Sequence, residues 1–225
     1  MSTTSVTYLY NSMMDRLNKL DSGSGSKVSK RQFVNAFNKM QLHWMEKRVE
    51  MDEINKTIQT ELQQFTEEHC KSPSIGKNKQ YCTIDVPEDF FHYRRVFGIN
   101  CGDCDHTVYA YAREEGAVNM LLLDDAQRPS MEWQETFFTI ANDKIRFYTD
   151  GEFKCKQVTL VYYRCPREID MLGIISDCKG KADIDPELDK ASLQEVLDLT
   201  TLLLAEDIMD QARYSTIAAR IQMFN

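Results

Sequence analysis

The chain has 225 residues, of which 42% are hydrophobic and 28% are charged. This balance excludes an intrinsically disordered chain and is typical of a protein that buries a core. A net charge of −8 argues against wrapping nucleic acid, because that depends on Lys and Arg neutralising phosphates. A local basic patch is compatible with this net charge, and so is an acidic channel wall along which DNA slides, so charge alone does not choose between them.

Membrane insertion and export are not expected from the sequence. No apolar run approaches the roughly 20 residues that span a bilayer, and the first residues lack the basic and apolar regions of a signal peptide. We therefore predict synthesis in a cytoplasm. The seven cysteines, an odd number in a chain of this size, predict reduced thiols rather than disulfides.

The first predicted element is a helix over residues 6–20, where apolar side chains recur at helical spacing. It ends at residues 21–26, a Ser-Gly stretch typical of a flexible joint. A second helix is predicted to begin at Ser29, which forms a capping box with Gln32 three residues later.

This second helix is predicted to be long. Val28 and Phe33 flank its start as a hydrophobic staple, and no Pro or Gly occurs between Ser29 and about His69. If unbroken, about 40 residues at about 1.5 Å each give a rod of about 60 Å, longer than a domain of this size covers by itself. We therefore predict that the helix contacts neighbouring subunits, or that it breaks once near Arg48.

From residue 81 the apolar pattern changes from helical spacing to alternation, which predicts strands. Turn signals at Glu115-Gly116, Asn142-Asp143 and Asp150-Gly151 separate several of them. Because the strands follow one another without helices between them, we predict an antiparallel sheet or small barrel. The predicted strands are residues 81–86, 96–101, 107–113, 118–123, 135–141, 144–148 and 156–164.

A second helical region is predicted after Pro166, which closes the last strand. Ser192 and Glu195 predict a helix start through another capping box. An apolar stripe then runs along one face, with acidic residues mostly off it, and helical spacing continues over residues 217–224. The stripe consists of Leu193, Val196, Leu197, Thr200, Leu203, Leu204 and Ile208.

These elements predict an α+β chain in three parts. Residues 1–70 form an N-terminal helical region that includes one long helix, and residues 71–170 form a central antiparallel β-domain. Residues 171–225 form C-terminal helices that pack with the N-terminal ones.

One short motif is a candidate metal site. Cys101, Cys104 and His106 place two thiols and an imidazole within six residues, as a zinc knuckle does. A closed zinc site needs a fourth ligand, which a facing strand would have to supply from Cys82, Cys155 or Cys165. The alternatives are buried or turn-lining cysteines and a redox dithiol, although the latter normally lies between a strand and a helix.

Catalytic motifs are not found. None of the four histidines lies in a nucleophile or metalloprotease motif, and no Gly-rich phosphate loop occurs. The acidic residues 183–189 lack the glycine and the closing glutamate of a calcium loop. We therefore predict no enzyme, no catalytic residue, no cofactor and no bound metal. A cysteine-dependent hydrolase is a weaker alternative, because no histidine can be paired with a cysteine from sequence.

Two segments combine aromatic residues with arginines beside a strand end, residues 87–95 and residues 161–170. Arg and Tyr are favoured at interfaces because they supply contact area together with hydrogen bonds. Arg164 and Arg167 are therefore candidate interface residues. A sheet with a solvated arginine rim explains the same pattern equally well.

The order of these parts resembles the ring and neck proteins of crAss-like and related tailed bacteriophages. The residues that carry the resemblance are the segment 7–14, the aromatic pair Phe33 and Phe37, Val86-Pro-Glu-Asp-Phe90, the segment 162–170, and the helix from Asp185 to Leu204 with Arg213-Tyr-Ser after it. The cysteine loop 101–106 departs from this pattern.

The resemblance implies a virion structural protein, made in the host cytoplasm, that forms a dodecameric ring of the head-to-tail connector. Its partners would be further copies of itself, the portal, and another ring or tail protein, with genome DNA passing without sequence-specific binding. A zinc-stabilised regulatory module built on Cys101, Cys104 and His106 is the alternative. The predicted docking residues are Leu193, Val196, Leu203, Leu204, Ile208, Arg213, Tyr214 and Phe224, with Arg164 and Arg167.

Overall fold

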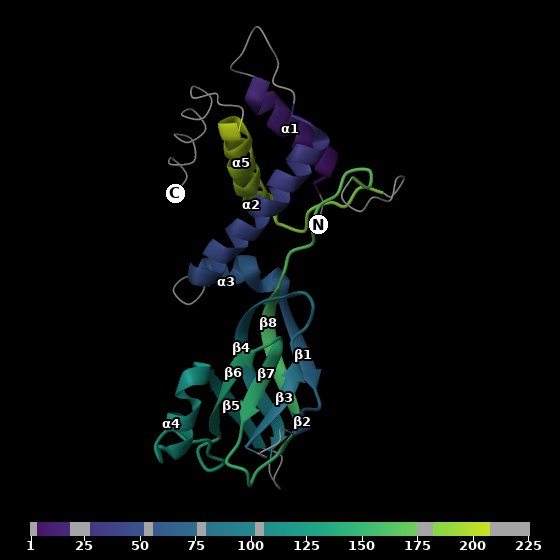
Figure 1. Cartoon of the computed structure of the whole chain (residues 1–225). Helices are drawn as coiled ribbons and strands as arrows, with labels where there is room; N and C mark the ends of the chain where they lie inside the picture. Colours follow the sequence, from purple (N-terminus) through teal and green to yellow (C-terminus); the bar gives the residue numbers. More distant parts are fainter. Residues whose placement is uncertain are drawn as a thin grey trace. The chain divides into compact units, whose positions relative to one another are not determined.

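The computed structural model describes residues 4–18, 28–51, 56–75, 80–101, 106–174 and 182–207. The chain divides into two compact units: residues 1–64 with 166–225, called here the helical unit, and residues 65–165, called the sheet unit. Each unit is described by itself. The helical unit contains helices from both ends of the chain, and the sheet unit contains one large curled sheet (Figure 1). The α+β class agrees with the sequence prediction.

The helical unit brings together segments from both ends of the chain. In it α5 contacts α1 and α2, and each helix buries one apolar face, such as Val6, Leu9, Met13 and Leu17 of α1. Burial of such a stripe supplies most of a helix's stability. The helices of this unit are α1 (Val6–Asn18), α2 (Lys30–Met51), α3 (Lys56–Leu62) and α5 (Lys190–Asp207), with the short η1 (Gln63–Phe65) at its boundary.

The start of α2 confirms the predicted capping box. The Ser29 backbone N–H donates to Gln32 Oε1 at 2.9 Å, and the Gln32 N–H donates to Ser29 Oγ at 3.2 Å. The predicted box at the start of α5 is wrong, because Asp189 caps that helix by accepting from the N–H groups of Ala191 and Ser192 at 3.0 and 3.4 Å. An aspartate three residues earlier competes successfully for the same role.

The prediction of helix up to about His69 is wrong at its end. Residues Thr66–Lys71 form β1, which pairs antiparallel with β8 (Cys155–Arg164), so that Thr66 faces Tyr163 and Lys71 faces Val158. Long-range backbone pairing with a strand about ninety residues away is not visible in local periodicity. Residues 52–55, which the predicted helix includes, lie outside the described residues.

The sheet unit contains a single described sheet of eight strands in the order β1-β8-β4-β5-β6-β7-β3-β2. It is mixed, which corrects the prediction of a purely antiparallel β-domain: β5 and β6 run parallel, with Tyr109 facing Glu135. The remaining strands are β2 (Ser74–Ile75), β3 (Tyr81–Asp85), β4 (Phe90–Cys101), β5 (His106–Ala112), β6 (Glu135–Ala141) and β7 (Lys144–Tyr148).

Residues predicted as a strand at 118–123 instead form α4 (Val118–Leu123), which follows η2 (Glu115–Ala117). A parallel pair needs a crossover connection, and α4 is part of the one that joins β5 to β6. Glu115 holds the start of this connection on the sheet, because it accepts from Thr139 Oγ1 at 2.6 Å and pairs with Arg146. A short apolar run does not distinguish a strand from a helix by itself.

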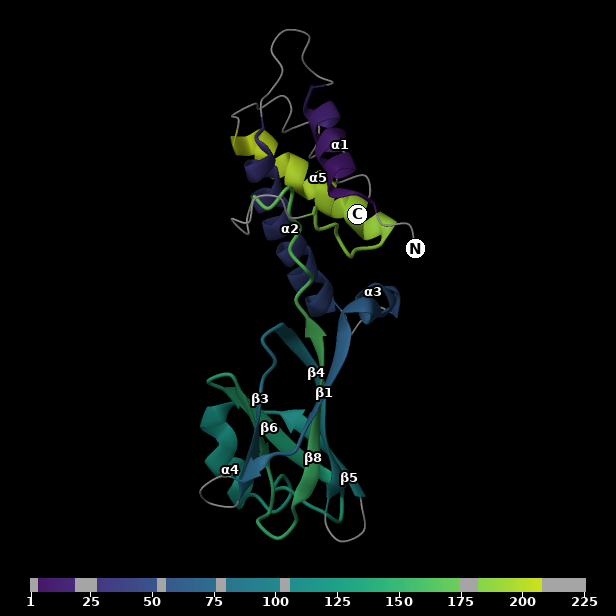
Figure 2. The ribbon, with the colours of Figure 1, turned by 90° about the vertical axis from the view of Figure 1, so that its right-hand side faces the viewer.

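Alternating side chains give the sheet two apolar faces. On one face Phe137 and Tyr148 pack with Val118 and Leu121 of α4. The residues next to them in sequence, Phe138 and Phe147, belong to a separate core cluster. This main core includes Phe138, Phe147, Ile145, Val96, Val108, Val158 and Leu160. Figure 2 shows the sheet of this unit from a second side.

The predicted turns at the two ends of β7 are present. Asn142 and Asp143 have φ values of 52° and 57° and join β6 to β7, which fits the tight hairpin turn that favours Asn and Asp. After β7, Gly151 has a φ of 90°, and Asp150 Oδ1 accepts from the N–H groups of Glu152 and Phe153 at 2.8 and 3.0 Å.

Candidate interaction surfaces

The helical unit contains an open groove between α2 and α5. Its volume is about 550 Å³, and each helix contributes residues three, four and seven positions apart, which lie on one helical face. Apolar side chains provide most of its surface, and charged ones stand beside them. The lining residues are Lys39, Met40, Leu42, His43 and Glu46 of α2 and Leu199, Leu202, Leu203 and Glu206 of α5.

The groove, which we call the α2–α5 groove, leaves apolar surface open to solvent. Among its apolar residues, Leu42 is exposed, and Met40 and Leu203 are partly exposed. Polar side chains also line the groove, including His43 and Glu46, whose Nδ1 and Oε2 atoms lie 3.6 Å apart. Many interaction sites combine an apolar surface with a polar rim, so the α2–α5 groove is a candidate for one.

The other face of α5 holds the helical unit together. Glu195 accepts from Trp44 Nε1 at 3.1 Å and pairs with Arg48 at 2.6 Å, and Asp198 pairs with Arg16. Arg48 also pairs with Glu61 of α3 at 3.0 Å. Since these groups are partly buried, salt screens their interactions less than those of exposed ion pairs.

The structure separates the predicted docking residues into several groups. Leu193, Val196 and Leu204 are buried within the helical unit, and Leu203 lines the α2–α5 groove. The remaining helical candidates, Ile208, Arg213, Tyr214 and Phe224, lie outside the described residues. Most of the apolar stripe of α5 is therefore part of the core of the helical unit. Of the predicted docking residues on this helix, Leu203 is the one that faces the α2–α5 groove.

The two predicted interface arginines differ in exposure. Arg164, in the sheet unit, lies over the ring of Phe65 at 5.5 Å and pairs with Glu67 at 3.5 Å. Arg167, in the helical unit, has a side chain that is 68% exposed and lies 3.6 Å from Glu187. Arg167 is accessible to a partner, whereas Arg164 mainly joins β8 to the start of β1.

The sheet unit has a second hollow, which sequence reasoning missed. It has a volume of about 520 Å³ and is lined mainly by polar and aromatic side chains from β5, β6 and the loop between α4 and β6. We call it the aromatic cleft. Its lining residues are Tyr111, Arg113, Asp125, Ala126, Gln127, Arg128, Ser130, Glu132, Trp133, Glu135, Thr136 and Phe137.

The candidate zinc residues do not assemble in the described structure. Cys101 forms a disulfide with Cys155, so its sulfur cannot serve as a thiolate ligand. His106 Nδ1 lies 3.5 Å from Gln134 Nε2, and Cys104 lies outside the described residues. Among the residues that the structure describes, no three His, Cys, Asp or Glu side chains gather as a metal site.

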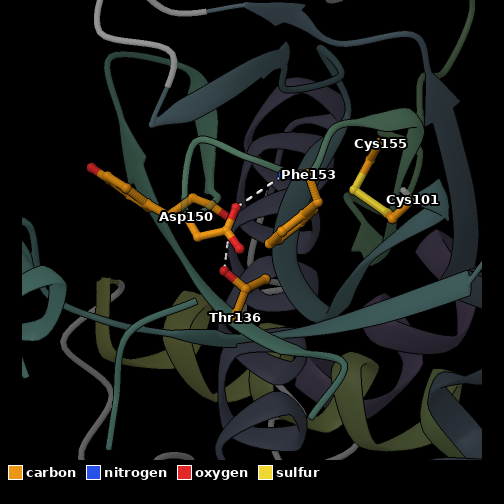
Figure 3. The surroundings of a disulfide bond; sticks show 6 residues. Cys101, Thr136, Asp150, Phe153 and Cys155 are labelled. Carbon is orange, nitrogen blue, oxygen red and sulfur yellow. Dashed lines mark hydrogen bonds between the residues drawn. A yellow bond between two sulfur atoms is a disulfide. The ribbon is translucent and has the colours of Figure 1, made fainter. Parts of the chain in front are cut away.

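The disulfide corrects the prediction that the cysteines are reduced. Cys101 of β4 and Cys155 of β8 face each other in the register of the sheet, a pairing that cysteine count and spacing do not reveal. Figure 3 shows Phe153 beside the disulfide and Asp150 bound to the backbone of Phe153. The turn after β7 thus leads into β8, where Cys155 lies opposite Cys101 of β4.

Cys82 is expected to resist alkylation in the native protein. It is buried in the sheet core, and burial raises its pKa from 9.0 to about 11, which lowers the thiolate fraction at pH 8 by about a hundredfold. After N-ethylmaleimide treatment, peptide mapping should find exposed Cys70 modified and Cys82 unmodified until urea is added. Equal native rates would contradict the burial of Cys82.

Comparison of the chain with models of known protein families, and with curated proteins, finds no match. Within the described ranges, none of the helices combines the length and the apolar character that a membrane crossing requires.

Proposed function

We propose that this chain is a non-enzymatic virion protein that forms a ring in the head-to-tail connector of a tailed bacteriophage. The ring docks on the portal and leaves a channel for the genome. The observation that carries the proposal is the α2–α5 groove, an open apolar surface on the helical unit. A chain that assembles into a ring needs such a surface on every copy.

The proposed occupant of the groove is a second copy of the chain. A closed ring is built from heterologous contacts, in which one surface of each subunit binds a different surface of the next. The groove supplies the first surface. Residues 208–225 supply the second, because Ile217, Ile221 and Phe224 recur at the four- and three-residue spacing of one helical face.

Each unit has a role in this proposal. The packing of α5 against α1 and α2 makes the body that binds neighbours and the portal, with α2 as the longest described helix. The sheet unit forms part of the collar or the seat for the next ring or tail protein. The net charge of −8 suits a wall that repels passing DNA. The protein is made in the host cytoplasm and ends in the virion.

Native mass spectrometry tests the ring directly. The chain is expected to form a closed oligomer, with dodecamers as the leading expectation, either alone or after addition of the portal protein from the same genome. Truncation after Ile208 should abolish both the ring and portal binding. A monomer under both conditions, or unchanged assembly of the truncated chain, would contradict the proposal.

A groove variant separates the role of the groove from that of the tail. Leu203→Glu places a charge in the apolar groove and should prevent oligomer formation without unfolding the helices, because Leu203 is only partly buried. Leu123→Glu is the matched control, since Leu123 is 85% exposed on α4 and lies outside the groove. Circular dichroism should show native helix content in both variants. Oligomers of unchanged size in Leu203→Glu would rule out the groove as the ring contact.

A further inference from the structure

Two aromatic rings stand open to solvent in the aromatic cleft. Trp133 is 74% exposed and Tyr111 is 50% exposed, and both line the cleft. A protein normally buries most of a tryptophan, because its ring carries a large apolar surface. The hollow has a volume of about 520 Å³, which lies within the range of small-molecule sites, and it presents this tryptophan beside polar side chains.

Hydrogen bonds hold the loop that carries Trp133 in place. Ser130 and Glu135 exchange backbone bonds at 2.9 and 3.2 Å, and the Trp133 N–H donates to Ser130 Oγ at 3.3 Å. Asp124 accepts at its side chain from Ala126 N–H at 2.9 Å. The backbone that carries Trp133 is therefore held in place before a ligand arrives, which reduces the entropy that the loop loses on binding.

The charges of the cleft nearly cancel. Its lining has two arginines, Arg113 and Arg128, and three carboxylates, Asp125, Glu132 and Glu135. Arg128 lies 3.2 Å from Asp125, and Glu135 accepts from the Tyr111 hydroxyl at 3.3 Å. A slightly acidic site disfavours phosphates and nucleic acid, and the arginines disfavour a cationic peptide. The polar lining also disfavours a purely apolar ligand.

We propose that the aromatic cleft binds a neutral saccharide. The apolar C–H face of a pyranose ring packs on an aromatic ring such as Trp133 or Tyr111, while its hydroxyls exchange hydrogen bonds with carboxylates, guanidinium groups and the Gln127 amide. Each of these groups lines the cleft. The whole cleft lies in the sheet unit, whereas the α2–α5 groove lies in the helical unit, so saccharide binding and ring formation can be tested separately.

Tryptophan fluorescence tests the proposal, because the chain has only two tryptophans. Trp44 is 1% exposed, whereas Trp133 is 74% exposed, so Trp133 is the one that a ligand reaches. The full chain is titrated with neutral tetrasaccharides of glucose, mannose, galactose, xylose and N-acetylglucosamine. At least one is expected to change the emission saturably, and Trp133→Phe should remove the change while Trp44 still emits.

Matched variants locate the site. Tyr111→Ala and Glu135→Gln should weaken binding by about tenfold or more, as loss of a central contact does. Tyr109→Ala should leave it unchanged, because Tyr109 is exposed on the same strand but does not line the cleft. Isothermal titration calorimetry of the unlabelled wild-type chain provides a readout that needs no substitution.

Three results would overturn saccharide binding at this cleft. The first is no saturable signal with any of these tetrasaccharides by either method. The second is an equal loss of affinity in Tyr109→Ala and Tyr111→Ala. The third is saturable binding of a dT tetranucleotide in place of the sugars, which would assign the cleft to single-stranded DNA.

Discussion

Asn38→Ala is expected to lower the free energy of unfolding of the helical unit by about 2–6 kcal/mol. The buried Asn38 side chain donates from Nδ2 to the Ile169 carbonyl at 3.1 Å and accepts at Oδ1 from the Ile169 N–H at 2.9 Å. Alanine leaves both backbone groups of fully buried Ile169 without these partners, and each such group costs about 1–3 kcal/mol. Urea denaturation followed by Trp44 fluorescence in a Trp133→Phe background measures the change.

Asn35→Ala is the matched control for this prediction. Asn35 lies on the same helix but is exposed, and substitution at an exposed helix position changes stability by only about 0.5 kcal/mol or less. A similar small effect for Asn38→Ala would show that Asn38 does not anchor the segment after Pro166 to α2. The anchor matters to function because this segment leads from the sheet unit to α5, which forms one side of the α2–α5 groove.

Gly98→Ala is expected to destabilise the sheet unit by about 3 kcal/mol or more, at or above the usual upper end for overpacking. A Cβ atom at Gly98 would lie 2.6 Å from Cys155 Sγ, 2.7 Å from Cys101 Sγ and 3.0 Å from Phe147 Cζ. The disulfide and a side chain at position 98 therefore compete for the same space. Thermal unfolding followed by far-ultraviolet circular dichroism measures the loss.

Two comparisons test the cause of this effect. Gly116→Ala should change stability by about 0.5 kcal/mol or less, because a Cβ there meets nothing within 4 Å. When Cys101 and Cys155 are both replaced by alanine, both sulfur atoms are gone and Gly98→Ala should cost much less, as a double-mutant cycle reports for residues in contact. An undiminished penalty would place the clash elsewhere than at the disulfide.

The features that the sequence predicted well are local ones. The capping box of Ser29 and Gln32 and the turn at Asn142 and Asp143 depend on side chains within a few residues of each other, so their patterns are readable from sequence. Alternation also identified most strands of the sheet, because a strand buried on one face must alternate. The α+β class followed from the order of these local patterns.

The features that the sequence mispredicted depend on partners far away in the chain. Residues Thr66–Lys71 follow a segment with helical periodicity, but they form a strand because β8 pairs with them. Val118–Leu123 becomes a helix because β5 and β6 run parallel and need a crossover. Cys101 meets Cys155 because the register of β4 and β8 places them opposite each other. Local propensity is too weak to specify such long-range pairings.

The same division applies to the candidate sites. By itself the sequence determined that α5 carries an apolar stripe, since that is a property of one helix. Only the tertiary structure decided which residues of the stripe are core and which face the groove, because burial depends on how α1 and α2 pack against α5. The aromatic cleft likewise exists only in the fold, because Tyr111 and Trp133 are brought together by the parallel pairing of β5 with β6 and the loop that precedes β6.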